Sequence, residues 1–278
     1  MLKRLRRAHP VGYCLLTEVV FLAVLMVVPV LLVLLLAMLG VDLTRVDDYS
    51  LSAIQELLGA LVAVFFLKKT DRLGLLRRRG SGFFNGILVG MFPFAMICYT
   101  LYGKLLFGMP TDRPLRTGWQ IAWYFIGMFT VGVAEEFLFR GVIAQTLLEH
   151  FGTSRAGIWK ACLLSGLFFG GAHLTNILSS APFGVLMQCV FAGSLGVLFA
   201  AIYFRTGNLW VLVFLHGAQD AASLLAGGLY GTENMSTAVS SYDSTMLLSV
   251  LVYLIPTFFL LRKKKIGEVG LYFGKDIQ

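Results

Sequence analysis

Long apolar runs separated by short polar stretches divide the chain. A helix needs about 20 apolar residues to cross the ~30 Å hydrocarbon core of a bilayer. Eight runs meet or nearly meet that length: 13–39, 51–67, 83–107, 118–148, 158–178, 184–204, 208–229 and 244–261. The second run is short, and the fourth is long enough to extend out of the lipid. The pattern predicts an all-α polytopic membrane protein, a bundle of about eight transmembrane helices, with residues 1–278 in a single integral-membrane domain.

The composition agrees with this interpretation and excludes a large soluble domain. The chain is 58% hydrophobic and only 14% charged, whereas a soluble globular chain has about 25% charged residues. The net charge of +8 does not indicate nucleic acid as a partner, because the basic residues cluster at the ends of the apolar runs, where they set membrane topology.

The basic residues also predict an orientation. With the N-terminus placed inside, 18 of the 23 lysines and arginines fall on the inner side, four on the outer side, and Arg140 within the membrane. Because cytoplasmic loops carry the excess of lysine and arginine, both termini are predicted to be cytoplasmic.

Small residues recur at helical spacing inside two of the runs. They form the stretches "GILVG" at 86–90 and "GLFFG" at 166–170. Small side chains let membrane helices approach closely, so we expect helix packing at both places.

Three ionisable residues interrupt the fourth run, in the stretch "VGVAEEFLFRGV" at 131–142. Each such group costs roughly 2.5–3.5 kcal/mol at a helix centre. Glu136 and Arg140 are four residues apart, in the order that favours an ion pair. Glu135 points about 100° away, so we expect it to face a hydrated cavity, where a carboxylate can act as a general base on water. A purely structural ion pair explains Glu136 and Arg140 but leaves Glu135 unexplained.

Two further motifs lie in the fifth and seventh runs. "FGGAH" at 169–173 ends in His173, and "HGAQD" at 216–220 places His216 and Asp220 on one helix face. Taken singly, each histidine also fits a hydrogen-bonded packing role. Three such groups on three segments predict one shared polar cavity that resembles a water-activating hydrolase centre. Glu18 and Glu56 have no obvious local partner, and we expect them to be interfacial or helix-pairing residues, with lining of the cavity as the lesser alternative.

The order E-E-x-x-x-R, F-x-x-x-H and H-x-x-x-N/D resembles the CPBP family of intramembrane proteases. This family includes the CAAX prenyl endopeptidases and Abi-type proteins of bacteriocin self-immunity. The resemblance covers residues 118–230. It implies eight helices around a conical cavity open to the cytosol and bilayer. It also implies that Glu135 activates water, Glu136 and Arg140 organise it as an ion pair, and His173 assists the water or the oxyanion.

By the same resemblance, His216 and Asp220 complete the side of the site that stabilises the anion or holds the water. The prenyl proteases commonly have Asn where this chain has Asp220, and an ionised Asp cannot donate a hydrogen bond to an oxyanion. The family's metalloprotease label leaves open a divalent metal such as zinc. Its candidate ligands here are Glu135, His173, His216 and Asp220, and the alternative is a glutamate–water mechanism without a cofactor.

The sequence therefore predicts a membrane endopeptidase that cleaves a peptide bond at or within the bilayer. The expected partners are a peptide or lipidated-protein substrate and membrane lipid, and the expected location is a prokaryotic cell (inner) membrane. Two alternatives stay open. One is a proton-coupled transporter, because intramembrane Glu, Asp and His also form proton relays. The other is a non-catalytic bacteriocin-immunity membrane protein.

Overall fold

The computed structural model describes residues 1–43 and 46–274, which contain helices and no strand. Arg45 and Lys275, which the charge count includes, lie outside the described residues. The α-helices are α1 Leu2–Ala8, α2 Pro10–Met38, α3 Asp48–Lys69, α4 Phe83–Val89, α5 Met91–Phe107, α6 Gly118–Glu136, α7 Gln145–Phe151, α8 Arg155–Ala172, α9 Pro182–Thr206, α10 Leu209–Ser223, α11 Leu225–Tyr230, α12 Met235–Ser240, α13 Leu248–Leu260 and α14 Lys263–Phe273. Shorter 3-10 helices cover Leu73–Arg77, His173–Leu178 and Ser244–Leu247, and a π-helix covers Phe137–Ala144. The all-α prediction is confirmed.

Within the described part of the chain, five helices are long and apolar enough to cross a membrane. They are Pro10–Met38, Asp48–Lys69, Gly118–Phe151, Arg155–Leu178 and Pro182–Thr206. Two bent pairs bring the number to seven if each pair is one span: α4 with α5, bent by 81°, and the segment Ser244–Leu260 with α14, bent by 77°. The chain is an integral membrane protein, and the second expected run is a full helix of 22 residues.

The remaining expected span, 208–229, is divided into two helices at Leu224. The first of them, α10, has 15 residues, fewer than the roughly 20 that a straight spanning helix needs. The break follows Ser223, and α11 continues for only six residues. Eight spans therefore remain a prediction.

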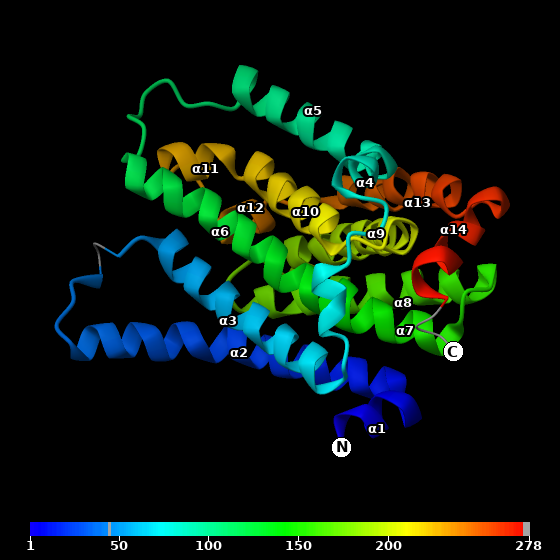
Figure 1. Ribbon diagram of the computed structural model, residues 1–278. Coiled ribbons are helices and arrows are strands. Elements are labelled where there is room, and N and C mark those ends of the chain that lie inside the picture. The colour runs from blue at the N-terminus through cyan, green and yellow to red at the C-terminus, as the bar shows by residue number, and fades with distance from the viewer. Residues whose placement is uncertain (44–45, 275–278) are drawn as a thin grey trace.

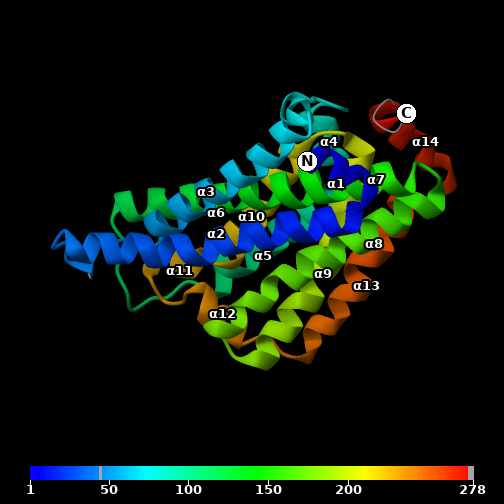
Figure 2. The same ribbon diagram turned by 90° about the horizontal axis from the view of Figure 1, so that it is seen from below.

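Helix α9 lies at the centre of the bundle (Figures 1 and 2), where it packs against α8 and α13. Its C-terminal half, from Ser194 to Thr206, is buried throughout. Helix α6 packs against α3 on one side and α10 on the other. This arrangement brings the ends of α6, α8 and α10, which carry the three sequence motifs, to the interior of the bundle.

Ion pairs tie the basic end of the bundle together, where α1 and α14 both lie (Figure 1). Glu149 on α7 accepts Arg6 from α1 and Arg72 from the loop after α3, each at 2.9 Å. Arg205 at the end of α9 pairs with Glu268 on α14. The terminal helices are thereby fixed to the same end of the molecule.

The small residues of "GLFFG" face α9, as predicted. A Cβ added to Gly166 would lie 2.6 Å from the Gly193 carbonyl oxygen, and one added to Gly170 would lie 2.5 Å from the Cys189 carbonyl oxygen. In "GILVG", Gly90 lies at the break between α4 and α5, and its Cβ would meet Leu215 of α10 at 2.7 Å. Both glycine stretches therefore permit close approach between helices.

Replacing Gly170 by alanine is expected to lower the free energy of unfolding by about 1–3 kcal/mol, the usual cost of overpacking. The reason is that the new methyl group would meet backbone rather than a movable side chain. Gly171→Ala is the matched control, because nothing lies within 4 Å of its added Cβ. Denaturation of both variants in mixed detergent micelles measures the difference. Equal stabilities would contradict close packing of α8 against α9.

Candidate active site

The first motif lies where one long helix changes its winding. Helix α6 begins at Thr117, whose hydroxyl forms a capping box with Gln120, and it ends at Glu136. The π-helix Phe137–Ala144 continues directly from it and is buried along its whole length. π-Helical turns are rare and occur frequently at functional sites. The change of winding thus falls immediately after the two glutamates and carries Arg140.

A buried ion pair joins Glu136 to Arg140, as the spacing predicts. The Arg140 Nη1 donates to Glu136 Oε1 at 2.8 Å, and neither side chain is exposed to any extent. The guanidinium also lies over the rings of Phe169 and Phe199, with its central carbon 4.4 and 5.2 Å from the ring centroids. These cation–π contacts stabilise a charge that water does not reach.

His216 connects this ion pair to the other two carboxylates. Its Nδ1 donates to Glu136 Oε1 at 2.8 Å, since a carboxylate oxygen only accepts. Its Nε2 lies 3.6 Å from Glu135 Oε2 and 3.5 Å from Asp220 Oδ2, slightly longer than a hydrogen bond. The first and third motifs therefore meet at one imidazole.

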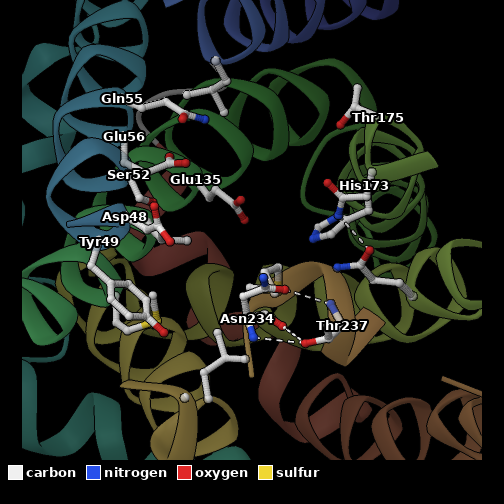
Figure 3. Close-up of a pocket in the computed structure, with 18 of the residues that line it drawn as sticks. Asp48, Tyr49, Ser52, Gln55, Glu56, Glu135, His173, Thr175, Asn234 and Thr237 are labelled. Atoms are coloured by element: carbon white, nitrogen blue, oxygen red, sulfur yellow. Dashed lines mark hydrogen bonds between the residues drawn. The ribbon is translucent and has the colours of Figure 1, made fainter. Parts of the chain in front are cut away.

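His173 is held by its own helix. Its Nδ1 lies 2.8 Å from the carbonyl oxygen of Phe169, and because a carbonyl only accepts, the proton belongs on Nδ1. The Nε2 atom then keeps its lone pair. The Phe169 ring lies against both imidazoles, with centroid distances of 5.1 Å to His173 and 5.6 Å to His216. Figure 3 shows Glu135 and His173 pointing into the same cavity from facing walls.

Two adjoining cavities meet at this site. The larger, about 670 Å³, is lined by Glu135 and His173. The smaller, about 340 Å³, is lined by the same two residues and by His216 and Asp220. Glu135 Oε2 is buried and has no hydrogen-bond partner among the described residues. The structure therefore brings Glu135, His173, His216 and Asp220 together around one space. Glu136 and Arg140 line neither cavity, and Glu136 contacts the group through His216.

Polar residues that the motifs do not include complete the smaller cavity. They include Gln188, Glu233 and Tyr242. Burial, followed by the charges of Asp220 and Glu233, raises the pKa of Tyr242 above its ordinary value. Its hydroxyl therefore stays protonated at neutral pH and can donate a hydrogen bond to a bound peptide.

Residues 117–222 match the family described as "Rce1-like: Type II CAAX prenyl endopeptidase Rce1-like". All three motifs lie inside the matched segment. This segment is similar to that family. Among curated proteins there is no match to the chain. The matched CAAX-protease segment runs from the cap of α6 to the last turn of α10, so it contains the six residues assembled above and leaves α2 and α3 outside.

Among residues 1–43 and 46–274, no three His, Cys, Asp or Glu side chains are arranged so that they could hold a metal ion. Glu135 and Asp220 both approach His216 Nε2, and His216 donates from Nδ1 to Glu136. The metal ligand set named from the sequence stays a prediction.

Glu56 takes the lesser alternative of the sequence interpretation. Glu56 on α3 is 7% exposed and lines the larger cavity with Glu135, so it is not an interfacial residue. The signal was present, because Asp48, Ser52 and Glu56 are spaced by four residues and form one polar face of a helix. Glu18 on α2 is also buried but is absent from the walls of both cavities.

Proposed function

We propose that the protein is a membrane endopeptidase of the CAAX-protease type in which Glu135 activates the attacking water. The observation that carries this proposal is the buried Glu135 Oε2, which lacks a hydrogen-bond partner in the described structure and faces a cavity opposite His173. A carboxylate in that position can accept a proton from a water that fills the cavity.

The first step is attack on the scissile carbonyl. Glu135 takes one proton from the water while the water oxygen forms a bond to the carbonyl carbon. The Nε2 lone pair of His173 accepts the second water hydrogen as a hydrogen bond and so aligns the water. The electron pair of the carbonyl bond moves to its oxygen, which becomes an oxyanion.

The second step is departure of the amine. The oxyanion electron pair re-forms the carbonyl, the C–N bond breaks, and Glu135 returns its proton to the leaving nitrogen. Glu136 and Arg140 act as positioning residues, since Glu136 holds His216 through Nδ1. Asp220 Oδ2 lies 3.5 Å from His216 Nε2, and a protonated Asp220 has an O–H that can donate to the oxyanion where the family commonly has an amide.

The substrate class follows from the two walls of the larger cavity. One wall consists of apolar side chains of α2, including Phe21, Leu22 and Leu25, and another wall, on α3, is polar. A peptide or a lipidated protein can place its lipid or apolar side chains on the first wall and its backbone on the second. The family description, which names prenyl endopeptidases, supports a prenylated peptide as the first substrate to assay.

Cleavage by the purified protein tests this function. A quenched fluorescent prenylated CAAX peptide and its unprenylated counterpart are incubated with the wild type and with Glu135→Ala and His173→Ala variants in detergent micelles. Cleavage that survives in both variants would overturn the assignment. Proton-driven peptide flux into proteoliposomes without cleavage would instead support the transporter alternative. The reaction as proposed uses a glutamate and a water, without a metal.

We also propose that the cavity opens on the face of a prokaryotic cell membrane opposite the cytoplasm. Basic residues gather at the end that holds α1 and α14, which supports a cytoplasmic position for that end. The exposed residues around the larger cavity, including Asp48, Gly231 and Thr232, belong to segments joining the other ends of the helices. The cytosolic opening implied by the family resemblance is therefore incompatible with the orientation implied by the charges, and we favour the charges.

A membrane-impermeant maleimide is expected to label Thr232→Cys in intact cells and to label Arg155→Cys only after permeabilisation. Both positions are exposed, and they lie at opposite ends of the bundle. The background carries Cys98→Ala and Cys189→Ala, since the other two cysteines are buried. Labelling in the reverse pattern would show that the cavity opens to the cytoplasm.

A further inference from the structure

Helix α3 presents a row of polar side chains to the larger cavity. Asp48, Ser52, Gln55 and Glu56 all line it, and Figure 3 shows them on the wall beside Glu135. They occupy the same face because residues three, four and eight positions apart recur on one side of a helix. This face belongs to a helix outside the matched family segment.

Glu56 is the unusual member of the row. It is 7% exposed, and its Oε2 has no hydrogen-bond partner among the residues that the structure describes. The side chain points into the cavity toward Glu135 (Figure 3). A buried carboxylate is costly unless a positive group or several hydrogen bonds accompany it. The position of Glu56 therefore indicates that a bound ligand supplies the group that compensates its carboxylate.

The charges around the cavity say which kind of group this is. Among the described residues that line the larger cavity, Arg116 is the one lysine or arginine. It forms an ion pair with Asp47 at 2.9 Å. Glu233 is paired with Lys104 at 3.0 Å. Asp48, Glu56 and Glu135 then remain as three carboxylates without a lysine or arginine of the described cavity wall beside them. A cationic group complements such a site better than a neutral or acidic one.

We infer that Glu56 binds a cationic group of the substrate, a lysine or arginine side chain or a free amino terminus, next to the bond that Glu135 hydrolyses. This inference rests on the proposed protease function. Glu56 would thus select substrates by charge, while Glu135 performs the hydrolysis. A peptide with one basic residue near its cleavage site satisfies the site, and one with an acidic residue there is rejected.

The test compares peptides that differ only in one charge. Quenched peptides carrying lysine or its neutral isostere norleucine, at each of three positions on either side of the cleaved bond, are assayed in detergent micelles. At one position the wild type is expected to show a kcat/KM about 10–100-fold higher for lysine, the range of a hydrogen bond to a charged group. Glu56→Gln is expected to bring that ratio close to one.

Glu18→Gln is the matched control, because Glu18 is a buried membrane acid away from both cavities. It should leave the lysine-to-norleucine ratio at the wild-type value. A Glu56→Gln variant that is slower on both peptides with an unchanged ratio would overturn the inference and show a structural role only. A wild type without preference at any position would overturn it as well.

Binding separates this inference from the proposed hydrolysis. Fluorescence anisotropy measures how tightly the lysine and norleucine peptides bind to the Glu135→Gln protein and to the double variant Glu135→Gln, Glu56→Gln. A lysine preference that Glu56→Gln removes would support the inference even if the wild type cleaves neither peptide, in which case the protease function alone fails. Equal binding of both peptides by the Glu135→Gln protein would overturn the inference.

Discussion

Glu135→Gln is expected to lower kcat by about 10²–10⁴-fold, the usual contribution of a general base. Glutamine has nearly the same shape but cannot accept the proton of the attacking water at neutral pH. Glu135 Oε2 has no hydrogen-bond partner within the described structure, and it lies 3.6 Å from His216 Nε2, so the substitution removes only this one long contact of the resting protein. The variant should therefore unfold at the same temperature as the wild type and bind peptide with little change in Kd.

The decisive measurement is the pair of kcat and unfolding midpoint for this variant. A large fall in kcat with an unchanged midpoint is expected of a group that acts in the chemical step. A normal kcat would remove Glu135 from the mechanism. A low midpoint would mean that Glu135 stabilises the bundle, and the loss of activity would then say nothing about catalysis.

Arg140→Met is expected to lower the free energy of unfolding by about 3–5 kcal/mol, the cost of leaving one partner of a buried ion pair uncompensated. Neither Glu136 nor Arg140 is exposed, so water cannot replace the lost guanidinium. The cation–π contacts with Phe169 and Phe199 are lost with it. Activity should fall too, because Glu136 would no longer be held where it orients His216.

The double variant Glu136→Gln, Arg140→Met separates charge from packing. It should recover part of the lost stability, because the uncompensated carboxylate is gone. Lys104→Met is the control for an ion pair that is about 30% exposed, and such pairs contribute only about 0–1 kcal/mol. Equal losses for Arg140→Met and Lys104→Met in mixed-micelle denaturation would contradict a special stabilising role for the buried pair.

Much of the fold was readable from the sequence because lipid imposes simple rules on length and polarity. The run 118–148 became the helix from Gly118 to Phe151, and the glycines of 166–170 became a helix contact. The bends were not readable. Helix α4 turns by 81° into α5 beside Gly90, and that direction depends on α10, which packs there from a distant part of the chain.

The candidate site was readable where its residues are close in sequence. The spacing of four linked Glu136 with Arg140 and His216 with Asp220, and both contacts exist. The hydrogen bond from His216 to Glu136 joins residues 80 positions apart, so no local pattern could reveal it. The main expectation for Glu56 missed the cavity for a similar reason, since only the packing of α3 on α6 turns its face toward Glu135. The π-helix was missed because its register depends on buried neighbours rather than on composition.

The placement of α1 and α14 at one end of the bundle has a practical consequence for tethering the protein. An affinity handle or a fluorophore joined beside α1 or α14 would be attached away from the exposed rim of the larger cavity, which lies at the start of α3 and between α11 and α12. Immobilisation through such a handle would leave that rim free in solution. A captured sample can then receive large ligands without obstruction from the solid support.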